Sequence, residues 1–108
     1  MNKKEKWAAF KASCRVYKSE KTTLSLYHSN GQGDEMFYSF LEDDIHFVES
    51  TFQDIDDKCG TSAKVMIWLL CVEGKSQIEV ADKYGLTRRA LQVSLYKWID
   101  EVFEDDDE

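Results

Sequence analysis

The sequence predicts an all-α fold, and three observations support this. Apolar residues recur at helical spacing in several separate segments, the chain contains no proline, and only five of its 108 residues are glycine. Because proline and glycine mark turns and loops, their scarcity favours helices joined by few sharp turns. About five helices are therefore expected, with at most one short β-hairpin between residues 22 and 40.

Residues 1–56 are expected to form an N-terminal helical extension. A first helix over residues 2–18 is indicated by an apolar stripe at spacings of three, four and three: Trp7, Phe10, Cys14 and Tyr17. Residues 22–28 alternate between polar and apolar types and are rich in strand formers, so they predict either a short strand or an extended connector. Residues 36–40 could pair with them as a hairpin. A helix from Asp34 to about Ile55 is preferred, because apolar residues keep helical spacing along it.

Residues 57–103 are expected to form a second unit with three short helices. The first begins at Thr61 or Ser62, whose side chains can cap it, and stops at Gly74. The next begins at Ser76, and Glu79 three residues later completes a capping box. The inward faces of the three helices are expected to pack together through Trp68, Leu69, Ile78, Ala81, Leu86, Leu91, Leu95 and Trp98.

A tight turn leads into the last helix. Gly85 can adopt the left-handed conformation that ends a helix, and Thr87 is a suitable N-cap for the helix that follows. That helix has an inward stripe at spacings of four, three and four: Leu91, Leu95, Trp98 and Val102. Its other residues point outward: Arg88, Arg89, Gln92, Val93, Tyr96 and Lys97. This is the layout of a helix-turn-helix whose second helix enters the DNA major groove. The alternative is an ordinary helical hairpin with two exposed arginines.

The order of these elements resembles a known module. An apolar helix, a Glu-Gly pair, a capped helix with a central Ala81, a Gly-Leu-Thr turn and a basic helix follow one another. This order is similar to region four, the promoter-recognition domain of bacterial sigma factors, and to small phage and mobile-element regulators of Gram-positive bacteria. The resemblance covers about residues 57–103 and implies a DNA-binding regulator of transcription. No core-polymerase-binding region or minus-ten-element region of a full sigma factor is recognised in residues 1–56.

The expected partner is double-stranded DNA. The candidate DNA-binding residues are Lys75, Thr87, Arg88, Arg89, Gln92, Val93, Tyr96 and Lys97. Arginine can form two parallel hydrogen bonds to guanine, and glutamine can do the same with adenine, so the arginine pair and Gln92 are expected to read bases. Other side chains are better placed for phosphates: Lys75, Thr87 and Tyr96.

Charge is distributed unevenly along the chain, whose net charge is −7. Residues 60–98 carry a net +3, whereas residues 23–59 carry −8 and residues 99–108 carry −7. Overall acidity opposes non-specific nucleic-acid binding, but a local basic face can still meet DNA. The acidic tail, residues 104–108, is expected to be disordered and solvated, or else to compete with DNA for the basic residues or to contact a basic protein.

A second function class therefore stays open. In it the chain is a protein-binding module that contacts RNA polymerase or another host protein through its acidic surface. A homodimer is also an open alternative, either through the helix from Asp34 or through the Trp7–Phe10 face, because helix-turn-helix proteins commonly pair to read two half-sites.

Several other classes are disfavoured. No apolar stretch is long enough to span a membrane and no signal peptide is recognised, so a cytoplasmic location is expected. Cys14, Cys59 and Cys71 are widely spaced, and they are expected to be reduced thiols rather than a disulfide framework or a zinc site. The chain lacks a glycine-rich phosphate loop and a nucleophile elbow, so neither enzymatic activity nor a cofactor is expected.

Overall fold

The computed structural model describes residues 2–30 and 35–103, and the side chains within them except those of residues 27–30 and 35–37. Five helices account for most of these residues: α1 (Lys3–Asn30), α2 (Glu35–Cys59), α3 (Thr61–Cys71), α4 (Gln77–Lys83) and α5 (Arg88–Val102). The described ranges contain no strand, so the prediction of an all-α fold is confirmed. Among these helices, none combines the length and apolar character needed to cross a membrane.

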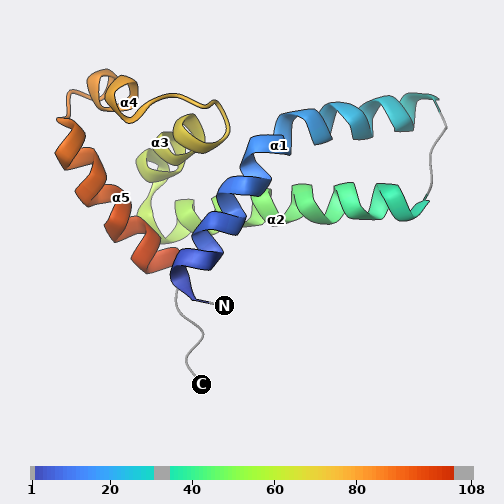
Figure 1. Ribbon diagram of the computed structural model, residues 1–108, viewed down its shortest axis with the longest axis horizontal. Helices are drawn as coiled ribbons and strands as arrows, with labels where there is room; N and C mark the ends of the chain where they lie inside the picture. Colours follow the sequence, from blue (N-terminus) through green and yellow to red (C-terminus); the bar gives the residue numbers. More distant parts are fainter. Residues whose placement is uncertain (1, 31–34, 104–108) are drawn as a thin grey trace.

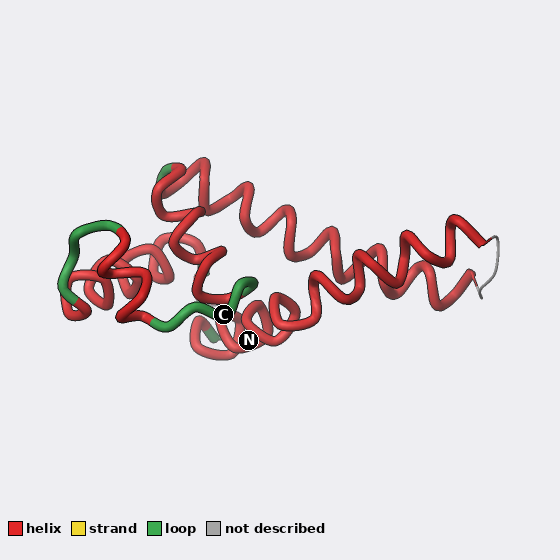
Figure 2. Tube along the Cα trace, turned by 90° about the horizontal axis from the view of Figure 1, so that it is seen from above, coloured by secondary structure: helices red, strands yellow, loops and turns green. Residues whose placement is uncertain are grey.

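The first two helices form a long antiparallel hairpin, and the three shorter helices gather around one end of it (Figure 1). Seen from above, the far part of the hairpin extends as an arm away from the short helices (Figure 2). The molecule is flat, with extents of 48 × 39 × 20 Å. As a result α5 lies at one edge of the molecule and the hairpin arm at the other.

The segment that was expected as a strand or connector, residues 22–28, is helical. α1 continues without a break to Asn30, and residues 36–40 lie in the first turns of α2, so the alternative of a β-hairpin is wrong and the preferred helix is confirmed. The Thr22 hydroxyl donates to the carbonyl of Lys18 one turn earlier, and Leu24 packs against the main core. Packing of α1 on α2 therefore overrides the strand preference of β-branched residues.

The helix predicted from Asp34 to about Ile55 is confirmed as α2, which continues to Cys59. It passes through the expected boundary between the two parts of the chain at residue 56. Its buried stripe consists of Leu41, Ile45, Val48, Phe52 and Ile55. Because α2 contacts α1, α3 and α5, it is the scaffold on which the C-terminal helices are placed.

The main core is centred on Phe10 of α1, which is fully buried. The centroid of its ring lies 5.2 Å from that of Phe52 and 5.4 Å from that of Phe103. Trp7 also packs on Phe103, with ring centroids 5.5 Å apart. The Trp7–Phe10 face therefore contributes to the core of the chain itself. Ile99 of α5 is also buried here, a position that the sequence pattern did not place in the core.

A second, smaller core joins α3, α4 and α5. Its buried residues are Met66, Val80, Ala81 and Leu91, and Leu69, Leu70, Leu86 and Trp98 pack around them. The prediction that Ala81 lies at the helix crossing is confirmed, since it is 2% exposed. The prediction for Ile78 is wrong, because its side chain is 58% exposed. Val80 takes its place, since two residues along a helix rotate the side chain by about 200°.

α3 begins differently from the prediction. Gly60, with φ 99°, is its N-cap, and no side chain caps the helix. The Thr61 hydroxyl instead donates to Asp56 at 2.9 Å, so the prediction that Thr61 or Ser62 caps α3 is wrong. The helix ends at Cys71, and Gly74, with φ 72°, reverses the chain in the connector to α4.

Candidate functional site

The turn between α4 and α5 is built from the residues that the sequence singled out. The Ser76 hydroxyl accepts from the backbone of Glu79, whose carboxylate accepts in return from the Ser76 backbone. Gly85 has φ 68°, and the Leu86 amide donates to the carbonyl of Ala81 at 2.8 Å, which closes the end of α4. The Thr87 hydroxyl accepts from the Ala90 amide at 3.0 Å. Both caps and the glycine turn are therefore confirmed.

The two faces of α5 differ sharply in exposure. Its inner face buries Leu91, Leu95 and Ile99 against the rest of the molecule. Its outer face presents Val93 at 61% and Tyr96 at 68% exposure. Arg88, Arg89 and Lys97 are exposed on this side of the helix as well. In Figure 1 α5 lies at one edge of the molecule.

Arg88 and Gln92 are held against α4. The Nε2 amide of Gln92 donates to Oε1 of Gln77 at 2.9 Å, and the Nε of Arg88 donates to the same oxygen at 3.2 Å. One acceptor at the start of α4 therefore fixes the orientation of two side chains on α5. Gln77 was missed by the sequence analysis, because its role depends on how α4 and α5 cross.

Lys75 and Thr87 lie on either side of α4. Lys75 is exposed in the α3–α4 connector, where its backbone amide donates to the carbonyl of Leu69 at 2.9 Å. Lys75 and Gln77 also line a cleft of about 260 Å³ together with Lys11 of α1. The hydroxyl of Thr87 is occupied by its capping bond. Six of the eight predicted site residues thus belong to α5, one to its cap and one to the connector.

Two acidic residues near the C-terminal end of α5 contact other helices. Oδ1 of Asp100 lies 2.6 Å from Nζ of Lys3 on α1. The Glu101 carboxylate accepts from the thiol of Cys59 at 3.4 Å. Within residues 2–30 and 35–103, no carboxylate pairs with Arg89 or Lys97. Residues 104–108, the predicted acidic tail, lie outside the described residues.

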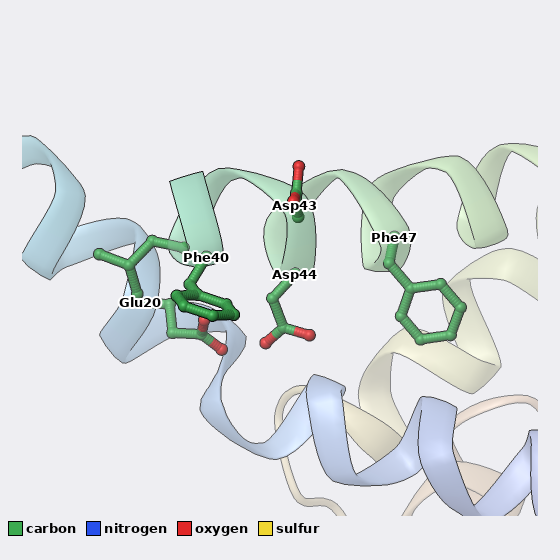
Figure 3. Close-up of a pocket in the computed structure, with 6 residues that line it drawn as sticks. Glu20, Phe40, Asp43, Asp44 and Phe47 are labelled. Atoms are coloured by element: carbon green, nitrogen blue, oxygen red, sulfur yellow. The ribbon is translucent and has the colours of Figure 1, made fainter. Parts of the chain in front are cut away.

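A second candidate site lies between α1 and α2, away from α5. A cavity of about 450 Å³ is lined by Glu20, Phe40, Leu41, Asp43, Asp44 and Phe47. Figure 3 shows the carboxylates of Glu20 and Asp44 turned toward the same space from two helices, whereas Asp43 points away. Phe40 is 69% exposed beside them. Exposed aromatic rings next to carboxylates suit a cationic side chain.

The carboxyl group of Glu20 in this cavity has a raised pKa. Burial, followed by the hydrogen bond to Asp44 and the charge of Asp44, raises the pKa of Glu20 to about 7. Its Oε1 atom is buried without a hydrogen-bond partner. The Ser13 hydroxyl donates to Asp44 at 2.9 Å, which stabilises the charge on that side of the pair. A cation placed between the two carboxylates would compete with the proton on Glu20.

Comparisons with known proteins do not indicate a function for the chain. No protein-family model, no curated protein and no solved structure matches the chain. Within the described part of the chain, no group of three or more histidine, cysteine or acidic side chains is arranged to hold a metal ion. The outer face of α5 and the acidic cavity are therefore the two sites from which a function can be argued.

Proposed function

We propose that the chain is a DNA-binding regulator of transcription in which α4 and α5 form a helix-turn-helix and α5 enters the major groove. One observation carries this proposal: the outer face of α5 is exposed, begins with two arginines, and is not covered by any described element. A helix that is capped, packed on one side and open on the other is the form in which side chains reach base edges.

The side chains of α5 divide into two roles. Arg89 and Val93 are exposed on the open face, where they would meet base edges. Arg88 and Gln92 are oriented in advance by Gln77, so less conformational entropy is lost when they bind. The flanking residues would contact phosphates: Lys75, Thr87, Tyr96 and Lys97.

The acidic groups do not oppose this arrangement from within α5. Asp100 is neutralised by Lys3, and Glu101 faces α2 through Cys59. The acidic cavity is lined only by residues of α1 and α2 and by none of α5. This separation of charge would orient the protein so that α5 faces the DNA and the hairpin arm points away from it.

A salt series with matched variants tests this proposal. Binding of labelled duplex fragments is measured by fluorescence anisotropy for the wild type, Arg89→Ala, Lys97→Ala and Lys21→Ala. Arg89→Ala should weaken binding of a preferred duplex by roughly 1–3 kcal/mol. Lys97→Ala should weaken all duplexes alike and lower the salt slope by about one. Lys21→Ala removes the same charge from α1, and it should change neither the affinity for the preferred duplex nor the salt slope. No binding at low salt, or equal effects of Arg89→Ala and Lys21→Ala, would reject the proposal.

The acidic cavity supports a second candidate function, a contact with RNA polymerase or another host protein that presents basic side chains. The cavity combines two facing carboxylates with an exposed aromatic ring. Binding of purified RNA polymerase is compared for Phe40→Ala and Tyr96→Ala, which remove exposed aromatic rings from opposite sites. Loss with Phe40→Ala alone supports this function, and no binding by the wild type removes polymerase as the partner.

A further inference from the structure

Two of the three cysteines meet although they are far apart in the sequence. Cys14 lies in the middle of α1 and is only 1% exposed, whereas Cys71 is the last residue of α3 and is partly exposed. Cys14 belongs to the main core and Cys71 packs against it, and a hydrogen-bonding interaction between the two thiols is the largest cause of the pKa shift of each. Both cysteines are free thiols here. The contact joins the helical hairpin to the unit that carries α4 and α5.

The two sulfur atoms have opposite electrostatic surroundings. The hydrogen bond from Cys14 and the positive charges of Lys11 and Arg15 lower the pKa of the Cys71 thiol, despite its burial. The hydrogen bond to Cys71, burial, and the charges of Cys71 and Asp44 raise the pKa of the Cys14 thiol. One sulfur is thus favoured as a thiolate and the other as a protonated thiol. A thiolate beside basic groups is the form that reacts with oxidants.

The Cys71 sulfur is also the more accessible of the two. Cys71 lines the cleft of about 260 Å³ that it shares with Lys11 and Lys75. Cys14 lies behind it, enclosed by the main core. A small oxidant can therefore reach Cys71 first, and Cys14 is the nearest thiol to any product formed there.

Cys59 offers an internal comparison. Its thiol donates to Glu101, and burial followed by that carboxylate raises the pKa of Cys59 to about 11. It carries almost no thiolate at neutral pH, although it is partly exposed. Exposure alone would make Cys59 a target, whereas thiolate character selects Cys71.

We propose that Cys71 and Cys14 form a reversible disulfide in response to peroxide, linking α3 to α1. The Cys71 thiolate attacks one oxygen of hydrogen peroxide, which gives a sulfenic acid on Cys71 and releases hydroxide. The Cys14 sulfur then displaces the hydroxyl group from the Cys71 sulfur, and the proton of Cys14 leaves with it as water. Two electrons pass from the two thiols to the peroxide, and a dithiol reductant restores both thiols. This inference does not depend on DNA binding.

The link would act where α3 passes into the α3–α4 connector. Lys75 and Gln77 follow Cys71 closely, and Gln77 holds Arg88 and Gln92 on α5. A covalent bond from Cys71 to α1 would restrict the motion of α3 relative to the hairpin. Oxidation would thereby reach the segment that positions the outer face of α5.

Oxidation of the full, reduced chain with stoichiometric hydrogen peroxide tests the proposal. Peptide mass spectrometry without reductant should find the Cys14 and Cys71 peptides joined, lighter by two hydrogen atoms, and separated again by dithiothreitol. Cys59→Ser should leave this product unchanged, and Cys71→Ser should abolish it. Cys14→Ser should leave a sulfenic acid on Cys71 that dimedone traps.

A second measurement needs no variant, in case Cys14→Ser does not fold. Limited alkylation of the wild type at neutral pH should modify Cys71 well before Cys59. Oxidation of Cys59 at the same rate as Cys71, disulfides only between separate chains, or alkylation of Cys59 before Cys71 would each overturn the proposal.

Discussion

Replacing Ala81 with leucine tests the packing that positions α5. Ala81 is 2% exposed and packs with Met66 and the fully buried Leu91 where α4 crosses α3 and α5. Leucine adds an isopropyl group where neighbouring side chains already fill the space, and such overpacking typically costs about 1–3 kcal/mol. A domain of this size loses about 4–8 °C of Tm for each kcal/mol, so Ala81→Leu should lower Tm by roughly 5–20 °C.

Ala8→Leu provides the matched control, because it adds the same atoms at an exposed position of α1. Surface substitutions of this kind usually change stability by no more than about 0.5 kcal/mol. Thermal unfolding followed by circular dichroism, with urea titrations at one temperature, measures both variants against the wild type. If Ala81→Leu unfolds at the same temperature as Ala8→Leu, Ala81 does not lie at the helix crossing and the placement of α5 on α4 is incorrect.

Three further predictions concern local structure and pH. A Cβ at Gly85 would meet open space, so Gly85→Ala should cost only the left-handed backbone strain, about 1–2 kcal/mol, and Gly85→Asn less; equal melting temperatures for both variants and the wild type would contradict this. Thr87→Ala should lose about 1 kcal/mol in the same melts, and Thr87→Ser should retain most of it. The folded-state pKa of Glu20 is about 7, above its ordinary 4.5, so its contribution to stability is present below pH 4.5 and is lost as pH rises through 7. Urea unfolding at pH 5 and pH 8 should therefore show a smaller difference for Glu20→Gln than for the wild type, and an unchanged difference would count against the Glu20–Asp44 pair.

The parts of the fold that were predicted correctly depend on neighbours in the sequence. Ser76, Gly85 and Thr87 act through hydrogen bonds or dihedral angles within a few residues, so the residue type and its spacing are sufficient to identify them. The same holds for α2, whose long apolar stripe has one period throughout. The outer face of α5 was predicted for the same reason.

The parts that were missed depend on packing between distant segments. Residues 22–28 favour a strand locally, but α2 supplies a surface that keeps them helical. Ile78 and Val80 are both apolar, and only the way α4 meets α3 and α5 decides which is buried. Gln77 has no local signal at all, since its two partners come from α5.

The acidic cavity and the thiol pair were beyond the sequence for a related reason. Glu20 and Asp44 come from different helices, as do Cys14 and Cys71. No sequence pattern relates the first two, and the last two were expected only to be reduced thiols. Their chemistry appears only when the antiparallel pairing of α1 and α2 and the docking of α3 fix which residues face one another.

Selection of bound duplexes from a random DNA pool, followed by titration of the selected duplex, tests the central claim most directly. The wild-type protein should enrich one sequence motif and bind it in a salt-dependent manner. The double variant Arg88→Ala with Arg89→Ala should keep its fold and lose binding of that duplex by roughly ten-fold to several hundred-fold. If the wild type enriches no motif, or if the folded double variant binds the selected duplex as tightly as the wild type, the proposal that α5 reads DNA is wrong.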